Sequence, residues 1–271
     1  APRLEGALLE ALPSLKAVFY GAGAVKQLVS QAFWNRRIKL TSAYKANAVP
    51  VAEYTLASIV FALKKTWQIN ADIRKGQDSK VEIPGVYHGS TVGIISLGAI
   101  GQLVCQKLKE FDLSVIAYDP FASSDTFSEL CVRQSPTLEA LFKESGVVSL
   151  HAPWLAETEG MITGDLLRSM PDGATFINTS RGAIVDEPAM LKVLQERKDL
   201  FAVIDVITDE SAYFSTALGK LPNVFMTPHI AGSKGRECHR MGSMAVEECR
   251  RHLDGKPALT EITEETIVIM A

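Results

Sequence analysis

From Thr91 onward, short runs of β-branched and aromatic residues alternate with stretches that have helical spacing. Six of these runs are expected to be strands: Thr91–Ile95, Ser114–Tyr118, Val147–Leu150, Ala174–Asn178, Phe201–Val206 and Val224–Met226. Helices are expected between several of them, at Gln102–Phe111, Asp165–Met170 and Pro188–Arg197. Continuous apolar strands that alternate with helices are typical of a parallel sheet covered on both faces. The pattern therefore predicts an α/β fold built on a doubly wound parallel sheet.

The residues before this region and after it follow a different pattern. Ala17–Tyr20 and Ile38–Ala43 are typical of strands, and Gly235–Leu253 is typical of a helix that returns the chain to the first region. Val51–Lys65 predicts a long helix that is apolar nearly all round, so we expect it to be buried between layers or subunits. The polar segment Lys75–Gly89 predicts a loop or linker. A chain of 271 residues favours two domains, which we place at residues 1–55 with 235–271 and at residues 56–234.

Composition excludes several classes of protein. Apolar residues make up 47% and charged residues 22% of the chain, as in an average soluble globular protein. The formal net charge of −3 argues against a nucleic-acid or acidic-membrane partner, and no apolar run reaches the roughly 20 residues of a membrane span. Four cysteines without metal-ligand spacing predict buried, reduced thiols in a cytoplasmic protein and no metal site.

The segment T-V-G-I-I-S-L-G-A-I-G, Thr91–Gly101, resembles the dinucleotide fingerprint that joins a strand to a helix. Gly98 would let the backbone approach a pyrophosphate, and Gly101 would let the helix pack closely on the strand. The first N–H groups of the helix, at Ala99 and Ile100, would face the phosphates. Ser96 replaces the first glycine of the fingerprint, and we expect it to fit the tight turn only with a negative φ.

An acidic residue follows at the end of the next expected strand. Asp119 lies about 20 residues beyond the glycines, where a carboxylate can accept hydrogen bonds from the adenosine ribose. Because that carboxylate would repel a 2′-phosphate, the sequence favours NAD over NADP as the cofactor. The alternative is a ligand-free turn in which Asp119 caps a loop.

Three polar residues follow the last three expected strands. Arg181, Glu210 and His229 should converge at the carboxyl edge of the sheet, where open α/β sheets bind ligands. Arg181 can hold a carboxylate and polarise a neighbouring carbonyl group, and His229 can donate a proton at neutral pH. Glu210 would fix the His229 tautomer and favour the imidazolium. Each residue also has a structural interpretation, as a surface arginine, a solvated acid and a buried histidine.

Taken together, the motifs resemble the D-isomer-specific 2-hydroxyacid dehydrogenase family, with members such as glyoxylate or hydroxypyruvate reductase and glycerate dehydrogenase. The motifs that carry the resemblance are V-A-E at Val51–Glu53, S-L-G-A-I-G with Y-D-P at Tyr118–Pro120, V-S-L-H-A-P at Val148–Pro153, I-N-T-S-R-G at Ile177–Gly182 and T-P-H-I-A-G at Thr227–Gly232. The resemblance implies a Rossmann NAD-binding domain and a flavodoxin-like substrate domain. It also implies that Arg181, Glu210 and His229 are the catalytic residues of a D-specific 2-hydroxyacid dehydrogenase.

The resemblance further implies the residues that surround the ligands, and the assembly. Those expected beside NAD are His151, Ala152, Pro153, Thr158, Thr179, Asp205 and Gly232, in addition to the fingerprint residues. The turn of Gly21, Ala22 and Gly23 is similar to the family's loop that binds the substrate carboxylate through backbone N–H groups. The family usually forms homodimers, so a homodimer is expected.

Two alternatives stay open from the sequence. The substrate domain is shorter than the family's and is expected to be N-terminally incomplete, either because a stretch is omitted or because the protein is a shortened variant. The expected substrate is a small 2-oxo or 2-hydroxy acid such as glyoxylate or hydroxypyruvate, and a phosphorylated acid would require an extra basic patch. The rival function is a non-catalytic NAD(H) sensor of the corepressor type.

Overall fold

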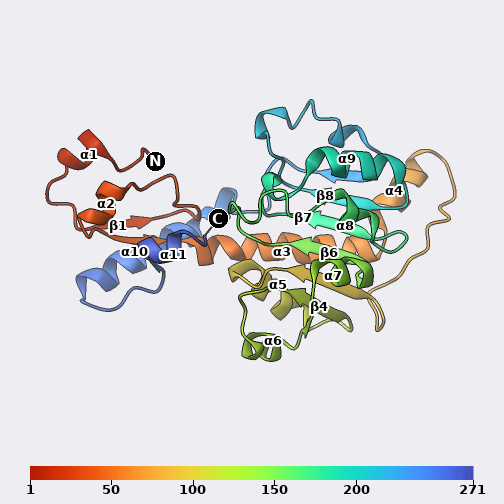
Figure 1. The fold of residues 1–271 in the computed structure, drawn as a ribbon, viewed down its shortest axis with the longest axis horizontal. Coiled ribbons are helices and arrows are strands. Elements are labelled where there is room, and N and C mark those ends of the chain that lie inside the picture. Colours follow the sequence, from red (N-terminus) through yellow and green to blue (C-terminus); the bar gives the residue numbers. More distant parts are fainter. Residues whose placement is uncertain (271) are drawn as a thin grey trace. The chain divides into compact units, whose positions relative to one another are not determined.

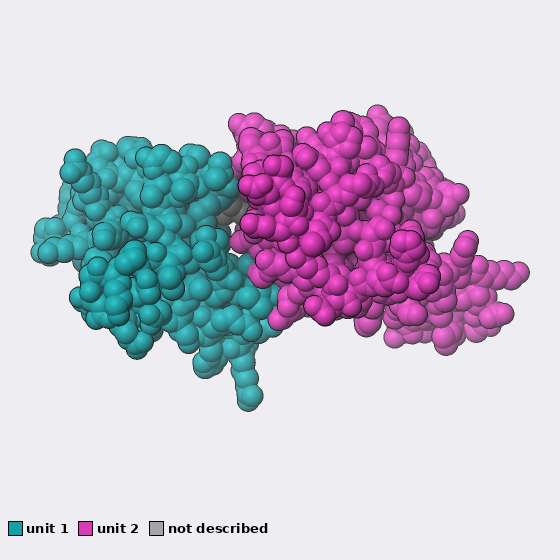
Figure 2. Space-filling view, turned by 90° about the horizontal axis from the view of Figure 1, so that it is seen from below, with its two compact units in different colours: residues 1–50, 232–271 teal, residues 51–231 magenta. Residues whose placement is uncertain are grey.

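The computed structural model describes residues 1–270, and these divide into two compact units. Unit 1 comprises Ala1–Pro50 and Gly232–Ala271, and unit 2 comprises Val51–Ala231 (Figure 2). The sequence had placed the two boundaries slightly later, at 55/56 and 234/235. Each unit has its own sheet; unit 2 has a buried apolar cluster on each face of its sheet, and unit 1 has one such cluster.

Unit 2 is built on a seven-stranded sheet in the order β5-β4-β3-β6-β7-β8-β9 (Figure 1). The strands are β3 Thr91–Ile95, β4 Ser114–Tyr118, β5 Arg133–Gln134, β6 Val147–Leu150, β7 Thr175–Asn178, β8 Phe201–Ile204 and β9 Val224–Met226. Every neighbouring pair is parallel, so the predicted doubly wound parallel sheet is confirmed. The strand order reverses between β3 and β6, which makes the carboxyl end of β3 the point where such sheets bind ligands.

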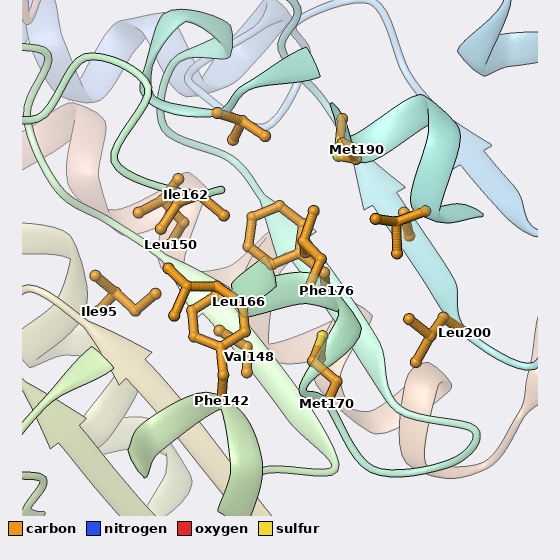
Figure 3. Close-up of a cluster of buried hydrophobic side chains, with 14 of the residues drawn as sticks. Ile95, Phe142, Val148, Leu150, Ile162, Leu166, Met170, Phe176, Met190 and Leu200 are labelled. Atoms are coloured by element: carbon orange, nitrogen blue, oxygen red, sulfur yellow. The ribbon is translucent and has the colours of Figure 1, made fainter. Parts of the chain in front are cut away.

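Helices cover both faces of this sheet because successive strand residues point to opposite sides. One face packs against α7 Leu138–Glu144, α8 Gly164–Arg168 and α9 Glu187–Glu196. The other face packs against α3 Tyr44–Leu63, α5 Ala99–Leu108 and α6 Ser124–Leu130. On β6, for example, Val147 belongs to one cluster and Val148 to the other. Figure 3 shows Val148 with Phe142 and Phe176 in the first cluster.

The remaining elements of unit 2 are short. They are α4 Thr66–Arg74 and three 3-10 turns, η1 Gly182–Ile184, η2 Glu210–Ala212 and η3 Leu218–Lys220. The sequence did not predict α4, which follows α3 after a break at Lys65. Lys65 has a φ of 54°, a left-handed conformation that ends the first helix and lets the second begin.

Unit 1 contains a three-stranded sheet in the order β1-β2-β10. Its elements are α1 Gly6–Glu10, β1 Ala17–Tyr20, α2 Gln31–Asn35, β2 Lys39–Ser42, η4 Gly235–Glu237, α10 Cys238–Leu253, β10 Glu261–Ile262 and α11 Glu264–Ile267. β1 and β2 are parallel, whereas β10 is antiparallel to β2. The sequence did not predict β10, since a two-residue strand leaves no periodic pattern.

The long helix α3 begins earlier than the sequence indicated. The expected start was Val51, but the helix begins at Tyr44 and contains Pro50. The extension is packed, since Ala46 and Ala48 are buried. α3 is also long and apolar enough to cross a bilayer by length and composition alone, but buried core helices meet the same criterion.

The prediction that the cysteines are buried was wrong for two of the four residues, and a third, Cys249, is only half-buried. All four are free thiols, and Cys105 is fully buried as expected. Cys131 and Cys238 are exposed, and Cys131 ends α6 in a left-handed conformation with a φ of 56°. A helix end is a surface position, so burial of that thiol is not required there.

Candidate functional site

Three polar side chains follow three neighbouring strands of the unit 2 sheet. Arg181 follows β7, Glu210 opens η2 after β8, and His229 follows β9. The Nδ1 atom of His229 lies 2.7 Å from Oε1 of Glu210. Because a carboxylate only accepts hydrogen bonds, Nδ1 is the protonated atom, and Nε2 is left to exchange a proton with a ligand.

Arg181 belongs to the same group of charges. Its guanidinium is half-buried and donates from Nη1 to the carbonyl oxygen of Ser180 at 2.7 Å. Burial lowers the pKa of Arg181, and the negative charge of Glu210 acts in the opposite direction. The guanidinium stays charged, since arginine does not lose its proton in proteins. Glu210 therefore acts on both residues, by a hydrogen bond to His229 and by its negative charge on Arg181.

The backbone of the His229 loop is fixed independently of the imidazole. His229 has a φ of 51°, and its N–H donates to the carbonyl oxygen of Asp205 at 2.8 Å. The Asp205 carboxylate accepts hydrogen bonds from the N–H groups of Ile230 and Ala231 at 2.8 and 2.9 Å. The Thr227 hydroxyl also donates to Oδ1 of Asp205 at 2.6 Å. Four hydrogen bonds to Asp205 thus hold a conformation that non-glycine residues rarely adopt.

Asp205 is completely buried, and its described contacts are with the protein itself. The resemblance implies a place beside NAD, and in the structure the Asp205 carboxylate anchors the loop that carries His229. Two neighbours had no sequence signal. Tyr54 on α3 contacts the Thr227 hydroxyl at 2.8 Å, and Tyr213 donates to the Asp205 carbonyl at 2.9 Å. Burial and the nearby carboxylates of Glu210 and Asp205 raise the pKa of Tyr213 to about 12.

The start of α5 has the features of a phosphate-binding turn. Gly98 is the N-cap residue, and within the described residues no side chain caps this helix. The first N–H groups of a helix have no partner inside it, so those of Ala99 and Ile100 can bind an anion. A Cβ atom on Gly98 would meet no described atom within 4 Å, whereas one on Gly101 would lie 2.0 Å from the carbonyl oxygen of Ser96. Gly101 therefore permits the helix–strand contact, and Gly98 leaves open space above the turn.

The expectation for Ser96 was wrong. Its φ is +74°, so the serine adopts the left-handed conformation for which the fingerprint normally uses glycine. The turn is retained because Asp119, at the end of β4, accepts a hydrogen bond from the N–H of Leu97 at 2.7 Å. A side chain from the next strand thus stabilises a backbone conformation that local sequence disfavours.

His151, directly after β6, has a buried atom without a partner. Its Nε2 lies 3.0 Å from the Ser149 hydroxyl, while its Nδ1 has no hydrogen-bond partner among residues 1–270. Buried polar atoms are nearly always hydrogen-bonded, so an unpaired one at the carboxyl edge of a sheet is the kind of atom a ligand can satisfy. Complete burial lowers the pKa of His151 to about 3, which keeps the ring neutral.

This shift predicts a specific pH dependence of stability. Below pH 6.5 the unfolded chain binds a proton that the folded chain excludes, so the free energy of unfolding falls as the pH drops from 6.5 toward 3. Between pH 7 and pH 5 we expect His151 to account for a loss of about 2 kcal/mol. Urea unfolding of the nucleotide-free protein at both pH values should show this loss, and His151→Gln should remove it. His88→Gln, at an exposed position, is the control. An equal loss of unfolding free energy between pH 7 and pH 5 in the two variants would contradict the assignment to His151.

The other residues expected near the cofactor have mainly internal partners. The Thr158 hydroxyl donates to the Pro153 carbonyl at 2.6 Å and accepts from the Leu155 N–H at 2.9 Å, which closes its own loop. Thr179 is buried against the Thr55 hydroxyl at 3.1 Å. Ala152 is buried, and its carbonyl oxygen accepts a hydrogen bond from the Ser180 hydroxyl. These contacts connect the loops that follow β6 and β7.

In unit 1, the turn that begins at Gly21 is held by its carbonyl oxygens. The buried Ser42 hydroxyl donates to the carbonyl groups of Ala22 and Gly23 at 2.9 and 2.7 Å. The N–H of Ala43 donates to the carbonyl groups of Tyr20 and Ala22, both at 3.0 Å. Because these bonds use the carbonyl side of the peptides, the N–H side stays free to bind an anion.

Asn47 on α3 supports the same turn, although no pattern in the sequence pointed to it. Its Oδ1 accepts a hydrogen bond from the N–H of Ser233 at 2.9 Å. A Cβ atom on Gly23 would lie 3.4 Å from its Nδ2, and one on Gly232 would lie 3.3 Å from its Oδ1. Asn47 thus packs between two glycines, and Gly232, which we expected beside NAD, belongs to unit 1.

Within residues 1–270, no three histidine, cysteine, aspartate or glutamate side chains gather closely enough to bind a metal ion.

Comparison with known proteins shows which family the sequence matches. The sequence model described as D-isomer specific 2-hydroxyacid dehydrogenase, NAD binding domain, matches residues 56–231. The chain is 28% identical over 266 residues to D-3-phosphoglycerate dehydrogenase of Archaeoglobus fulgidus, covering 98% of this chain but only 50% of that protein. It is 29% identical to glyoxylate reductase of Korarchaeum cryptofilum, covering 98% of this chain and 81% of that protein.

The fold is also that of solved structures. The chain aligns with D-lactate dehydrogenase with NAD+ from Lactobacillus jensenii at a TM-score of 0.83 and 22% identity, covering 97% of this chain and 84% of the other. The chain spans about half the length of the first curated relatives, since the second D-3-phosphoglycerate dehydrogenase is covered over 48%.

Proposed function

Because the chain belongs to the D-isomer-specific 2-hydroxyacid dehydrogenase family and carries its NAD-binding domain, we propose that the whole protein interconverts a small 2-oxo acid and its D-2-hydroxy acid. The observation that carries the proposal is the 2.7 Å hydrogen bond between His229 and Glu210, with Arg181 nearby at the carboxyl edge of the sheet. A proton donor, a carboxylate that orients it and a fixed cation are the groups that reduction of a 2-oxo acid requires.

In the reductive direction each group has one role. The bound dinucleotide supplies the hydride that forms the new C–H bond at C2. Nε2 of His229 donates the proton to the carbonyl oxygen, which becomes the hydroxyl group, and Glu210 stabilises the imidazolium before the transfer. Arg181 binds a substrate oxygen and stabilises the negative charge that develops on the carbonyl oxygen. In unit 1, we assign carboxylate binding to the N–H groups of the Gly21–Gly23 turn.

We assign cofactor contacts to residues of unit 2 that fit NAD. The pyrophosphate would be held by the N–H groups at the start of α5 beside Gly98, and the unpaired Nδ1 of His151 would bind a polar group of the dinucleotide. Asp119 favours NAD over NADP through its charge. Asp205, Thr158 and Thr179 act by shaping the loops that surround the cofactor.

The proposal is tested by following NADH absorbance with a panel of 2-oxo acids. The panel should include glyoxylate, hydroxypyruvate, pyruvate and a phosphorylated 2-oxo acid, and the products should be tested for D configuration. We expect turnover of at least one acid with NADH and much less with NADPH. Saturable NADH binding without turnover of any acid would overturn the enzyme and favour a non-catalytic NAD(H) sensor.

We further propose that the protein is a cytoplasmic homodimer that associates through the α3–α4 side of unit 2. Phe61 on α3 is 47% exposed and packs edge-on against Trp67 at 5.7 Å between ring centroids. Trp67 stacks on Phe225 of the edge strand β9 at 5.0 Å, and Ile73 at the end of α4 is 67% exposed. An exposed aromatic and aliphatic patch of this kind is typical of subunit interfaces.

If the protein associates through this patch, a charged side chain placed in the patch should prevent the dimer from forming. Phe61→Glu should shift the sedimentation coefficient of the protein from that of a dimer to that of a monomer, because an unpaired carboxylate cannot be buried in an interface. Leu253→Glu, at an exposed position of α10 in unit 1, is the control and should stay dimeric. A wild-type chain that sediments as a monomer at all concentrations would disprove the dimer.

A further inference from the structure

The Asp119 carboxylate is already saturated with hydrogen bonds from its own turn. Its Oδ1 accepts from the N–H groups of Phe121 and Ala122 at 2.8 and 3.1 Å. Its Oδ2 accepts from the N–H of Leu97 at 2.7 Å and from the Ser96 hydroxyl at 3.3 Å. A carboxylate offers about four acceptor positions, so none remains for a ribose hydroxyl unless one donor leaves.

These four donors differ in how easily they can be displaced. Three are backbone N–H groups whose positions are fixed by the fold around β3 and β4. The fourth is the Ser96 hydroxyl, which makes the longest of the four bonds and can rotate away about its Cα–Cβ bond. This hydroxyl is present because Ser96, with a φ of +74°, stands at the position where the fingerprint normally has a glycine.

We propose that Ser96 is a specificity-determining residue whose hydroxyl competes with the adenosine ribose for Asp119. This inference rests on the proposed NAD site. A ribose hydroxyl that reaches Oδ2 replaces the Ser96 hydroxyl, so binding exchanges one hydrogen bond for another and gains less than it would at a free carboxylate. Ser96 thereby weakens the affinity for every ligand that carries the adenosine ribose hydroxyls.

The negative charge of Asp119 makes the effect of the Ser96 hydroxyl different for NADH and NADPH. The carboxylate repels a 2′-phosphate whether or not Ser96 is present, so removing the hydroxyl helps NADH and leaves NADPH excluded. The ratio of the two dissociation constants should therefore increase when the hydroxyl is removed. A purely structural role of Ser96 would change the affinity for both dinucleotides in the same direction and to the same extent.

The test is calorimetric titration of Ser96→Ala, which removes the hydroxyl and keeps the Cβ atom and therefore the backbone strain. Binding of NADH and of ADP should tighten by about 3- to 10-fold, the value of one hydrogen bond to a charged acceptor after exchange. Binding of 2′,3′-dideoxy-ADP should not change, because this ligand offers no hydroxyl to Asp119. Ser124→Ala, on the exposed first turn of α6, is the matched control and should bind all three ligands as the wild type does.

Two outcomes would overturn the inference, and a third would overturn the proposed NAD site on which it rests. Unchanged or weaker NADH binding by Ser96→Ala would mean that the hydroxyl does not compete, or that it contacts the cofactor directly. Equal tightening for 2′,3′-dideoxy-ADP would mean that the effect does not pass through the ribose. A wild-type protein that binds neither NADH nor ADP would instead overturn the proposed NAD site, which keeps the two failures distinct.

Discussion

We expect His229→Asn to lower kcat for reduction of the 2-oxo acid by about 10²- to 10⁴-fold, the usual contribution of a general acid. Asparagine is the appropriate replacement because it tolerates a left-handed backbone, and His229 has a φ of 51°. The loop should keep its position, since its N–H groups are held by Asp205 and not by the imidazole. NADH binding and the melting temperature should therefore stay close to the wild-type values.

A substitution of Glu210 can test whether this residue acts by orienting the imidazole of His229 or by its negative charge. Glu210→Gln can still accept the hydrogen bond from Nδ1 of His229 but no longer stabilises the imidazolium. We expect a smaller loss in kcat than for His229→Asn, with the affinity for NADH unchanged. His88→Asn, at an exposed position of the same unit, is the control for both variants. Turnover by His229→Asn within a few-fold of the wild-type rate would remove His229 from the mechanism.

The inner strands of the unit 2 sheet were predictable because most of their residues are buried, whereas the exposed two-residue edge strand β5 was not predicted. Thr91–Ile95 and Ser114–Tyr118, for example, were predicted with their observed bounds, since a continuous β-branched run leaves few alternatives. Element ends that depend on tertiary packing were not predictable. The start of α3 is one such case, since Ala46 and Ala48 are buried in the extension that includes Pro50.

The candidate site was only partly predictable, for a related reason. His229, Glu210 and Arg181 follow strands, so their convergence could be inferred from the order of the sheet. Asn47 could not be inferred, because its partner Ser233 lies 186 residues further along the chain and no local pattern connects them. Ser96 was predicted with the wrong sign of φ, because the stabilising carboxylate of Asp119 belongs to another strand.

The second large effect is expected at the cofactor turn, where Gly98→Ala should weaken NADH binding by at least about 10-fold. The added methyl group meets no described protein atom within 4 Å, and the φ of −69° is allowed for alanine. The methyl group would instead occupy the space through which a pyrophosphate approaches the N–H groups of α5. The melting temperature should fall by only a few degrees, because alanine is less favourable than glycine as an N-cap by up to about 1 kcal/mol.

Measuring both the melting temperature and the NADH affinity of Gly98→Ala distinguishes loss of the binding site from loss of the fold. Gly101→Ala is less informative, since its methyl group would lie 2.0 Å from the Ser96 carbonyl oxygen and would disturb the turn whether or not a ligand binds there. Gly242→Ala on α10 is the matched control, because its methyl group also meets no described atom within 4 Å and lies in the other unit. If Gly98→Ala bound NADH as tightly as Gly242→Ala, with both proteins folded, the pyrophosphate could not lie against Gly98, and the dinucleotide would have to bind elsewhere on the sheet edge.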